Sequence, residues 1–259
     1  MAATFRPSIV LNKLFASALL SLLATACANS PTQPSFAGCS TATLRGPYGS
    51  QRNGQLAPGT ALTAVGLAIF DGNGHVLEQM TVSTNGIFTT ITNQSGGYTM
   101  DSDCTGLETD ANGNPVARLT MVHAGDEVLG ISIVPGTNVA VHFERIVGVC
   151  SQATLNGTYG FQRNGQTAPG ATLLALGIAT FDGKGNAVAT QTSERAGVIG
   201  AANTFPATYV VNRDCTGTQT DATTGSIFAQ MVVVHGGDEV LGMSLTPGNN
   251  VVVHYERTK

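Results

Sequence analysis

The sequence predicts an all-β protein made of two tandem homologous small antiparallel β-barrels, with β-sandwiches as the alternative architecture. Three observations support this prediction. A segment of roughly 110 residues occurs twice, several segments alternate apolar and polar residues with period two, and no segment combines helical periodicity with helix caps. Alternation of this kind is typical of strands whose two faces meet different surroundings.

The duplication extends over almost the whole chain after its first 38 residues. Its best matched segments are Cys39–Leu44 with Cys150–Leu155, Gln51–Gln55 with Gln162–Gln166, and Asp103–Gly106 with Asp214–Gly217. The offset is 111 up to this point and 112 from His123 against His235, so one residue was inserted between them. We expect repeat 1 at residues 39–146 and repeat 2 at residues 149–259. The connection is so short that the two barrels are expected to touch.

The first 26 residues have the features of an export signal. Arg6 and Lys13 give it a positive start, and the apolar run at residues 14–23 is too short to span a bilayer comfortably. Small residues, Ala24-Thr25-Ala26, then precede Cys27. This arrangement resembles a bacterial lipoprotein signal, and the resemblance implies that Cys27 receives lipid.

Lipid on Cys27 would attach the protein to the outer membrane of the bacterial cell envelope. Ordinary secretion with a free Cys27 is the alternative. Residues 27–38 contain two prolines and several small polar residues, which suits a tether between the anchor and the first barrel.

Cysteine spacing agrees with export. Cys39 and Cys104 are 65 residues apart, and so are their equivalents Cys150 and Cys215. Because an exported chain favours disulfides, we predict one disulfide in each repeat, with Cys27 as the odd cysteine. A metal or redox site of the Cys-x-x-Cys type is the weaker alternative, since no two cysteines lie close in sequence.

Composition excludes several classes of function. The signal contains two of the twelve basic residues and none of the sixteen acidic ones, which leaves a net charge of −6 on the rest of the chain. A nucleic-acid partner is therefore not expected, because it would favour a basic face. No stretch after the signal is long enough for a membrane helix, so membrane attachment would depend on lipid.

The strands are expected in order along each copy. Residues 62–70 and 172–181 are apolar runs without charge, and each has a glycine in its middle, Gly66 and Gly177. Such a glycine often marks a bend or a close approach of backbones, as at a barrel corner. Tight turns are predicted by Asp71–Gly74 and its equivalent Asp182–Gly185, and further turns by Asn85-Gly86, Pro135–Asn138 and Pro247–Asn250.

The last strand of each copy alternates cleanly. Val139, Val141 and Phe143 share one face, whereas Ala140, His142 and Glu144 share the other. In repeat 2, Val251, Val253 and Tyr255 oppose Val252, His254 and Glu256. Each copy thus contains eight or nine short strands, and the uninterrupted meander favours a barrel over a sandwich.

Several turn and packing motifs recur in both copies. They are Tyr48-Gly49 and Tyr159-Gly160-Phe161, the Phe-Asp-Gly-x-Gly turns, and a tyrosine followed by Asp-Cys-Thr-Gly. Together they resemble a family of exported bacterial β-barrel domains of unknown function, described as calycin-like or allene-oxide-cyclase-like barrels. The resemblance implies a fold and a compartment but no activity, and no catalytic residue follows from it.

Histidines and carboxylates that are repeated form a candidate metal or ligand site. His123 ends one expected strand, Glu127 begins the next, and Glu144 lies near the end of a third, so antiparallel connection brings them to one end of the sheet. Such groups hold zinc and other divalent ions, or act as an acid–base pair. Alternatively they are exposed or hydrogen-bonded residues of a hairpin. The full set is His123, Glu127, His142, Glu144, His235, Glu239, His254 and Glu256.

Arg52 and Arg163 occupy equivalent positions before an Asn-Gly pair. Each is expected either inside its barrel, paired with Glu144 or Glu256, or in solvent at a strand end. The repeated tyrosines are expected in the core, and they are Tyr48, Tyr98, Tyr159 and Tyr209.

The sequence contains neither a Gly-x-Ser-x-Gly elbow nor a phosphate loop that opens a helix, so no catalytic residue and no cofactor are predicted. The first hypothesis is a lipid-anchored envelope protein with a non-enzymatic role, which binds a protein or a small apolar ligand. The second is an enzyme of cyclase or isomerase type, or a divalent-metal binder, that uses the His/Glu residues. A purely structural spacer is the third.

Overall fold

The computed structural model describes residues 38–168 and 170–259 and confirms the all-β fold with two closed antiparallel barrels. The expected export signal, Cys27 and all but the last residue of the expected tether lie outside the described residues. None of the helices in the described part is long and apolar enough to cross a membrane.

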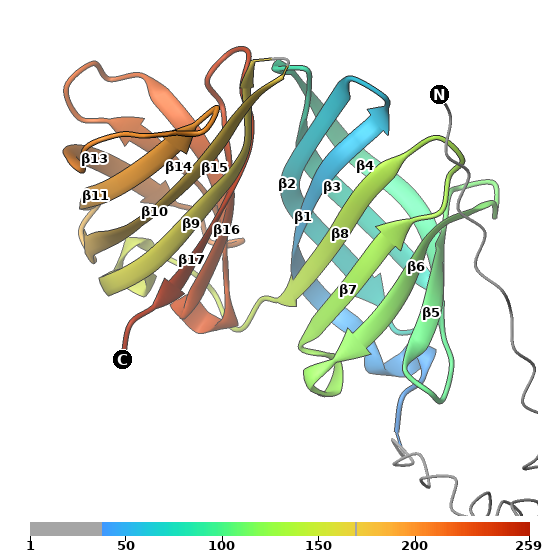
Figure 1. Cartoon of the computed structure of the whole chain (residues 1–259). Helices are drawn as coiled ribbons and strands as arrows, with labels where there is room; N and C mark the ends of the chain where they lie inside the picture. Colours follow the sequence, from blue (N-terminus) through green and yellow to red (C-terminus); the bar gives the residue numbers. More distant parts are fainter. Residues whose placement is uncertain (1–37, 169) are drawn as a thin grey trace, which may run out of the picture. The chain divides into compact units, whose positions relative to one another are not determined.

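Repeat 1 is a meander of eight strands, closed by the pairing of the first strand with the last (Figure 1). Its strands are β1 (Arg45–Ala57), β2 (Thr60–Asp71), β3 (His75–Thr84), β4 (Ile87–Met100), β5 (Thr105–Thr109), β6 (Pro115–Val122), β7 (Glu127–Ser132) and β8 (Asn138–Arg145). Short 3-10 turns precede β1 and β7, namely η1 (Thr41–Thr43) and η2 (His123–Gly125).

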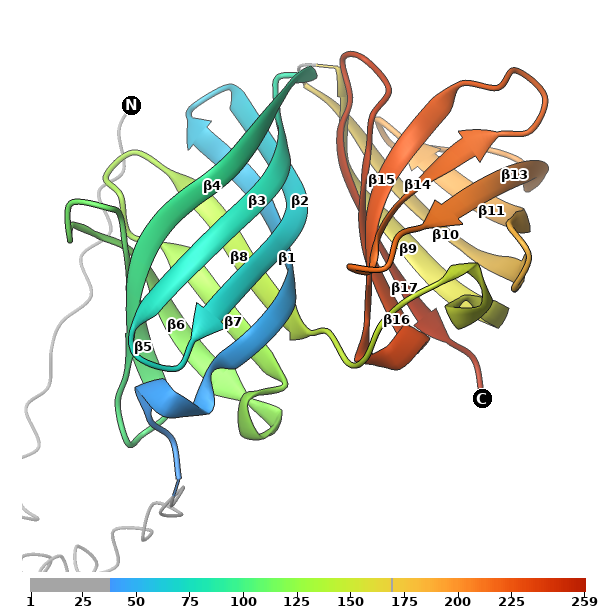
Figure 2. The ribbon, with the colours of Figure 1, turned by 180° about the vertical axis from the view of Figure 1, so that it is seen from behind.

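Repeat 2 has the same meander (Figure 2). It has one additional short strand, β12, which pairs only with β11 among the described strands. Its strands are β9 (Asn156–Ala168), β10 (Ala171–Asp182), β11 (Asn186–Arg195), β12 (Val198–Ile199), β13 (Asn203–Val211), β14 (Thr216–Asp221), β15 (Ile227–Val234), β16 (Glu239–Ser244) and β17 (Asn250–Arg257). Two 3-10 turns, η3 (Gln152–Thr154) and η4 (His235–Gly237), match those of repeat 1.

The two mid-strand glycines allow neighbouring strands to approach inside each barrel. A Cβ atom at Gly66 would lie 2.0 Å from the carbonyl oxygen of Gln79, and one at Gly177 would lie 2.3 Å from that of Thr190. No side chain fits at such distances, so glycine is required at both positions. The prediction of a close backbone approach is confirmed.

Aromatic rings fill one end of each barrel. Phe70 packs edge-on against Tyr48, Tyr98 and Phe143, with ring centroids 4.9 to 5.3 Å apart. Phe181 makes the equivalent contacts in repeat 2. The hydroxyl of Tyr48 donates to the carbonyl of Gly125 at 2.5 Å, so its buried polar group is satisfied. All four repeated tyrosines belong to the core, as predicted.

Both predicted disulfides are present. Cys39 is bonded to Cys104 and Cys150 to Cys215, with Cα atoms 5.1 and 4.9 Å apart. Each disulfide ties the segment before the first strand of a barrel to the turn between its fourth and fifth long strands. Disulfides persist in oxidising compartments, which agrees with an exported protein.

The repeats contact each other through outward faces of their sheets. The outer side chains of β1 and β2 meet β15, β16 and β17. Val65 on β2 is completely buried and belongs to the same apolar cluster as the core of repeat 2. The Nε2 atom of Gln51 donates to the carbonyls of Gly242 and Val253 at 2.9 and 3.1 Å. The expected contact between the two barrels is therefore present.

Candidate functional site

The repeated histidines and glutamates of repeat 1 come together where η2 leads into β7. Glu127 is paired with His142 at 2.8 Å and with His123 at 2.9 Å. Glu127 and Glu144 are opposite each other on β7 and β8. His142 lies two residues before Glu144 on the same face of β8, and its Nε2 atom is 3.1 Å from Oε1 of Glu144. Strand register thus explains why residues 15 or more positions apart meet.

Residues of repeat 2 complete this group. Oε2 of Glu144 is 3.5 Å from Nε2 of His235, and Oε1 is 3.9 Å from Nε2 of His254. His254 is also bonded to Glu239 at 2.9 Å. We call this set the inter-repeat cluster, and its members are Glu127, His142, Glu144, His235, Glu239 and His254.

Two of the eight predicted residues lie at the margin or outside. Among the described residues His123 forms an ion pair with Glu127 alone, and three quarters of its side chain is exposed. Glu256, the equivalent of Glu144, is exposed and makes no ion pair with any described residue. Six of the eight residues therefore form one asymmetric cluster, and the two repeats do not have two equal sites. Sequence reasoning missed this because it treated each copy alone.

Glu144 has an unusual environment. Its side chain is 2% exposed, and Oε2 accepts no hydrogen bond from the described residues. Burial, together with the negative charges of Glu239, Glu127 and Glu256, raises the pKa of Glu144 to about 9. The hydrogen bond from His254 lowers the pKa of Glu239 to about 2. At neutral pH the cluster thus holds a protonated carboxyl beside an ionised one.

This arrangement has two chemical capacities. Ligand atoms of Glu127, His142 and Glu144 lie within 4.8 Å of one another, and so do those of Glu144, His235 and Glu239. Imidazole and carboxylate together suit zinc and similar divalent ions. A neutral carboxyl beside imidazoles is also able to exchange protons with a bound molecule.

A second group of charges lies inside barrel 1. The guanidinium of Arg52 donates to Glu78 at 2.7 Å and to Glu108 at 2.8 Å. The expectation that Arg52 pairs with Glu144 is wrong, because Phe143 points inward and its neighbour Glu144 must point outward. The alternative expectation of a solvent-exposed Arg52 is wrong as well, since its side chain is mostly buried.

Barrel 2 keeps the arginine but lacks both carboxylates. By the offset of 111, Ala189 replaces Glu78 and Gln219 replaces Glu108. Arg163 has no carboxylate within 4.0 Å among the described residues, and its one side-chain partner there is Gln191 at 3.4 Å. The oxygen of Gln219 instead accepts from the hydroxyl of Tyr255 at 3.1 Å. Burial lowers the pKa of Arg163. Arg163 does not meet Glu256, so that expected pair is also wrong.

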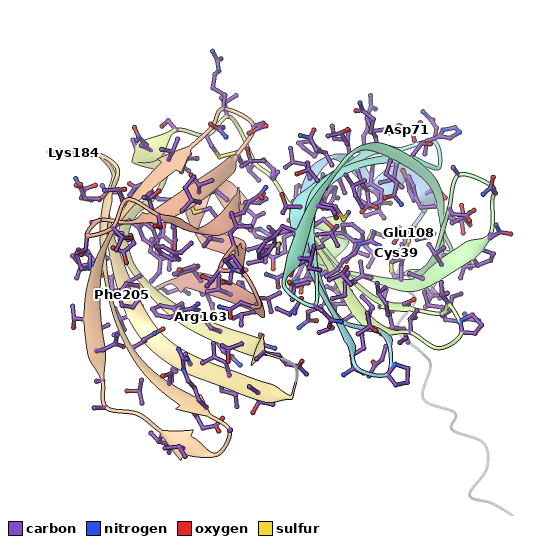
Figure 3. The ribbon with its side chains drawn as sticks, turned by 90° about the horizontal axis from the view of Figure 1, so that it is seen from above. Cys39, Asp71, Glu108, Arg163, Lys184 and Phe205 are labelled. Atoms are coloured by element: carbon purple, nitrogen blue, oxygen red, sulfur yellow. A yellow bond between two sulfur atoms is a disulfide. The ribbon has the colours of Figure 1, made fainter. Side chains whose placement is uncertain are left out.

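A small cavity lies in barrel 2, and its lining includes Ala189 and Gln219, which stand at the positions of Glu78 and Glu108. Its volume is about 20 Å³, which is room for about one water molecule. Arg163, Ala189, Phe205, Gln219, Phe228 and Tyr255 are among its lining residues. Figure 3 shows Glu108 within one barrel and Arg163 and Phe205 within the other.

The interior charges were missed because only positions kept in both copies were considered. Positions at which the two copies differ would have indicated these charges. Glu78 and Glu108 stand on strands that alternate in burial, yet both are lost in repeat 2 while Arg163 is kept. Positions that differ between the copies indicate where the two interiors have diverged.

No family model matches the chain, and no curated protein matches it. Among solved structures, the chain is similar to kievitone hydratase from Nectria haematococca. The TM-score is 0.26 and the sequence identity is 7%, over 88% of this chain and 95% of that one. A likeness at this level carries no argument about activity.

Proposed function

We propose that the protein is an exported envelope protein of non-enzymatic role, whose second barrel binds the anionic end of a small apolar ligand beside Arg163. The observation that supports this most directly is the difference between the two interiors. Arg52 is neutralised by two carboxylates of its own barrel, whereas Arg163 has none.

An arginine in a barrel interior needs acceptors. A guanidinium carries five N–H donors, and only one long contact to a side chain serves those of Arg163 within the described residues. Arg163 is only partly buried and has no carboxylate partner among the described residues, so an anion that enters is stabilised by both charge and hydrogen bonds. A carboxylate fits best, because it takes the place that the Glu78 and Glu108 carboxylates occupy in barrel 1.

The remaining lining of the cavity favours an apolar body on the ligand. Alanine, valine and phenylalanine side chains predominate there. Phe205 and Phe228 are only partly buried, and the proposal requires these two rings to rotate so that a space of about 20 Å³ admits more than the carboxylate. The ligand class is therefore a short aliphatic or aromatic monocarboxylic acid.

Calorimetric titration with formate, acetate, butyrate and hexanoate tests this proposal. Affinity should rise with chain length until the cavity is filled, by up to about 0.8 kcal/mol or roughly fourfold per methylene. Hexylamine, which carries the opposite charge, should not bind. Absence of binding for every acid would overturn the proposal.

Repeat 1 supplies matched control variants. Arg163→Gln should abolish acid binding, and so should the double change Ala189→Glu with Gln219→Glu, which restores the closed charge group of repeat 1. Arg52→Gln should leave acid binding unchanged. If Arg52→Gln and Arg163→Gln weaken binding equally, the ligand does not lie in barrel 2.

We further propose that Cys27 carries lipid and anchors the protein to the outer membrane. The disulfides support an oxidising compartment, and the sequence before Cys27 supports the lipid. The intact mass of protein extracted from membranes tests this directly. A mass without the lipid, or recovery only in the soluble fraction, would leave ordinary secretion.

Divalent-metal binding at the inter-repeat cluster is a second candidate function. The buried Oε2 of Glu144, which accepts no hydrogen bond from the described residues, favours it. Equilibrium dialysis with Zn²⁺ should show one ion per chain, lost in Glu144→Gln and in His235→Ala and retained in Glu256→Gln. Retention of the ion by both cluster variants would exclude this site.

A further inference from the structure

The contact between the two repeats uses two different faces. Repeat 1 contributes the outer side of β1 and β2, which we call the donor face and which includes Gly49, Gln51 and Val65. The hairpin between β3 and β4 adds to this contact, since the carbonyl of Gly86 accepts from the backbone N–H of Gly248 at 3.2 Å. Repeat 2 contributes the outer side of β15, β16 and β17, which we call the acceptor face. Its apolar side chains are completely or almost completely buried, and they are Val232, Val234, Leu241, Met243 and Val252.

Because the two repeats are copies, repeat 2 also has a donor face and repeat 1 also has an acceptor face. The donor face of repeat 2 lies on β9 and β10, and its leucines and isoleucine are exposed. Val65 is 0% exposed, whereas its equivalent Leu176 is 69% exposed. Leu174 and Ile178 flank it on the same side of β10, at 52% and 54%. Strand β10 is thus apolar on both faces although one of them is uncovered, and a continuous apolar run of this kind is typical of a strand that is buried on both faces.

Repeat 1 has the complementary free acceptor face. Leu129 and Ile131 on β7 are the equivalents of Leu241 and Met243, and they are 46% and 60% exposed. Thr120 and Ala140 beside them are exposed as well, where repeat 2 has buried Val232 and Val252. The molecule therefore has one free donor face and one free acceptor face.

A glycine on the free donor face supports the same interpretation. A Cβ atom at Gly49 would lie 2.6 Å from the Val234 side chain, so close contact between the repeats requires glycine there. At the equivalent Gly160 no atom lies within 4 Å of such a Cβ, and nothing in the repeat itself demands glycine. Gly160, Gln162, Leu176, His254 and Glu256 line a surface groove of about 340 Å³.

The charged residues beside these faces also meet at the contact between the repeats and lack a partner of this kind at the free faces. Within the chain, Glu144 of repeat 1 meets His235 and Glu239 of repeat 2. The equivalent residues that lack this contact are Glu256 on repeat 2, and His123 and Glu127 on repeat 1. Glu256 lies beside the free donor face, and His123 and Glu127 lie beside the free acceptor face.

We propose that the free donor face of one molecule binds the free acceptor face of a second copy, in the geometry that joins the repeats within the chain. Gly160 then approaches Val122 and Leu129 of the second copy, Gln162 donates to its backbone, and Glu256 completes a second cluster with its His123 and Glu127. Such a head-to-tail contact produces rings where the rotation closes and filaments where it does not. The proposal is independent of the ligand in barrel 2.

Sedimentation velocity of the exported chain with Cys27→Ser tests this without a contribution from lipid. The weight-average mass should rise steadily with concentration beyond that of a dimer. Gly160→Val on the donor face and Ile131→Lys on the acceptor face should each weaken association by at least about tenfold, equal to about 1.4 kcal/mol. Val210→Lys changes an equally exposed residue outside both faces and should have no effect.

Mixing the two variants distinguishes a head-to-tail contact from a symmetric one. Gly160→Val keeps its acceptor face and Ile131→Lys keeps its donor face, so the mixture should form a one-to-one dimer and nothing larger. At a concentration between the dissociation constants of the wild type and of the variants, each variant alone should stay monomeric. A wild-type protein that is monomeric at all concentrations overturns the proposal, as does a mixture that stays monomeric or a single variant that still dimerises.

Discussion

The Oε2 atom of Glu144 lies 3.5 Å from Nε2 of His235, and this contact joins two copies of one domain through residues that both copies possess. The equivalent pair, Glu256 with His123, does not meet within the chain. Duplication therefore gave each barrel the same residues. Glu144 is buried because repeat 2 packs on it, whereas its equivalent Glu256 has no such neighbour and is exposed.

The first prediction concerns the dependence of stability on pH. The pKa of Glu144 is raised to about 9 in the folded chain, so between roughly pH 4.5 and 9 the folded state holds a proton that the unfolded state releases. This contribution to the free energy of unfolding is complete below about pH 4.5 and is lost as the pH rises to about 9. Glu144→Gln has no such proton, so its stability should fall less over this range in urea unfolding with EDTA.

Two features make that measurement specific. The depressed pKa of Glu239, about 2, acts in the opposite direction and below pH 4.5, outside the window. Glu256→Gln removes only the smallest of the charges that raise the pKa of Glu144, so its slope should stay close to that of the wild type. Equal slopes for Glu144→Gln and wild type would contradict the assignment.

The second prediction compares the two interior arginines. Arg52→Gln leaves Glu78 and Glu108 buried together without a cation, and removal of one partner from a buried ion pair costs about 3–5 kcal/mol. Arg163→Gln removes a charge that lacks a counter-ion, so its cost should be below about 1 kcal/mol. Hydrogen exchange followed by mass spectrometry assigns each loss to its barrel. Similar losses for both variants would disprove the difference between the interiors.

The third prediction concerns the disulfides. Each closes a loop of 65 residues, for which the chain-entropy model gives about 4 kcal/mol. Replacing Cys39 and Cys104 by serine should lower the protection of barrel 1 from hydrogen exchange by about this amount. The same replacement of Cys150 and Cys215 should affect barrel 2 to the same extent. An effect confined to one pair would show that the copies are not equivalent in this respect.

The fourth prediction tests the contact between the repeats. A valine at Gly49 would press on Val234 and should destabilise the chain by about 1–3 kcal/mol, as overpacking does. It should also make the connection at residues 146–149 more accessible to proteases. Gly160→Val, at the equivalent open position, should leave the stability of the monomer unchanged. Equal stability of the two variants would mean that the repeats do not pack at Gly49.

Sequence determined the architecture of each copy because its signals are local. Period-two alternation defines which side of a strand is buried, and Asn-Gly and Asp-Gly pairs define the turns, so neither needs a distant partner. The duplication added independent support, since Cys39 with Cys104 and Cys150 with Cys215 gave the same spacing twice. The fold class and both disulfides could thus be predicted before any coordinates.

Tertiary structure alone decided where the charges meet. The alternation of side chains along β8 already excludes a pair between Arg52 and Glu144, because Glu144 faces outward. Only closure of the barrel brings Glu78 on β3 and Glu108 on β5 to Arg52 on β1. Likewise, no pattern within one copy specifies which outer face is covered by the other copy. Side-chain direction is a local property of a strand, whereas burial and pKa depend on what the rest of the chain places opposite it.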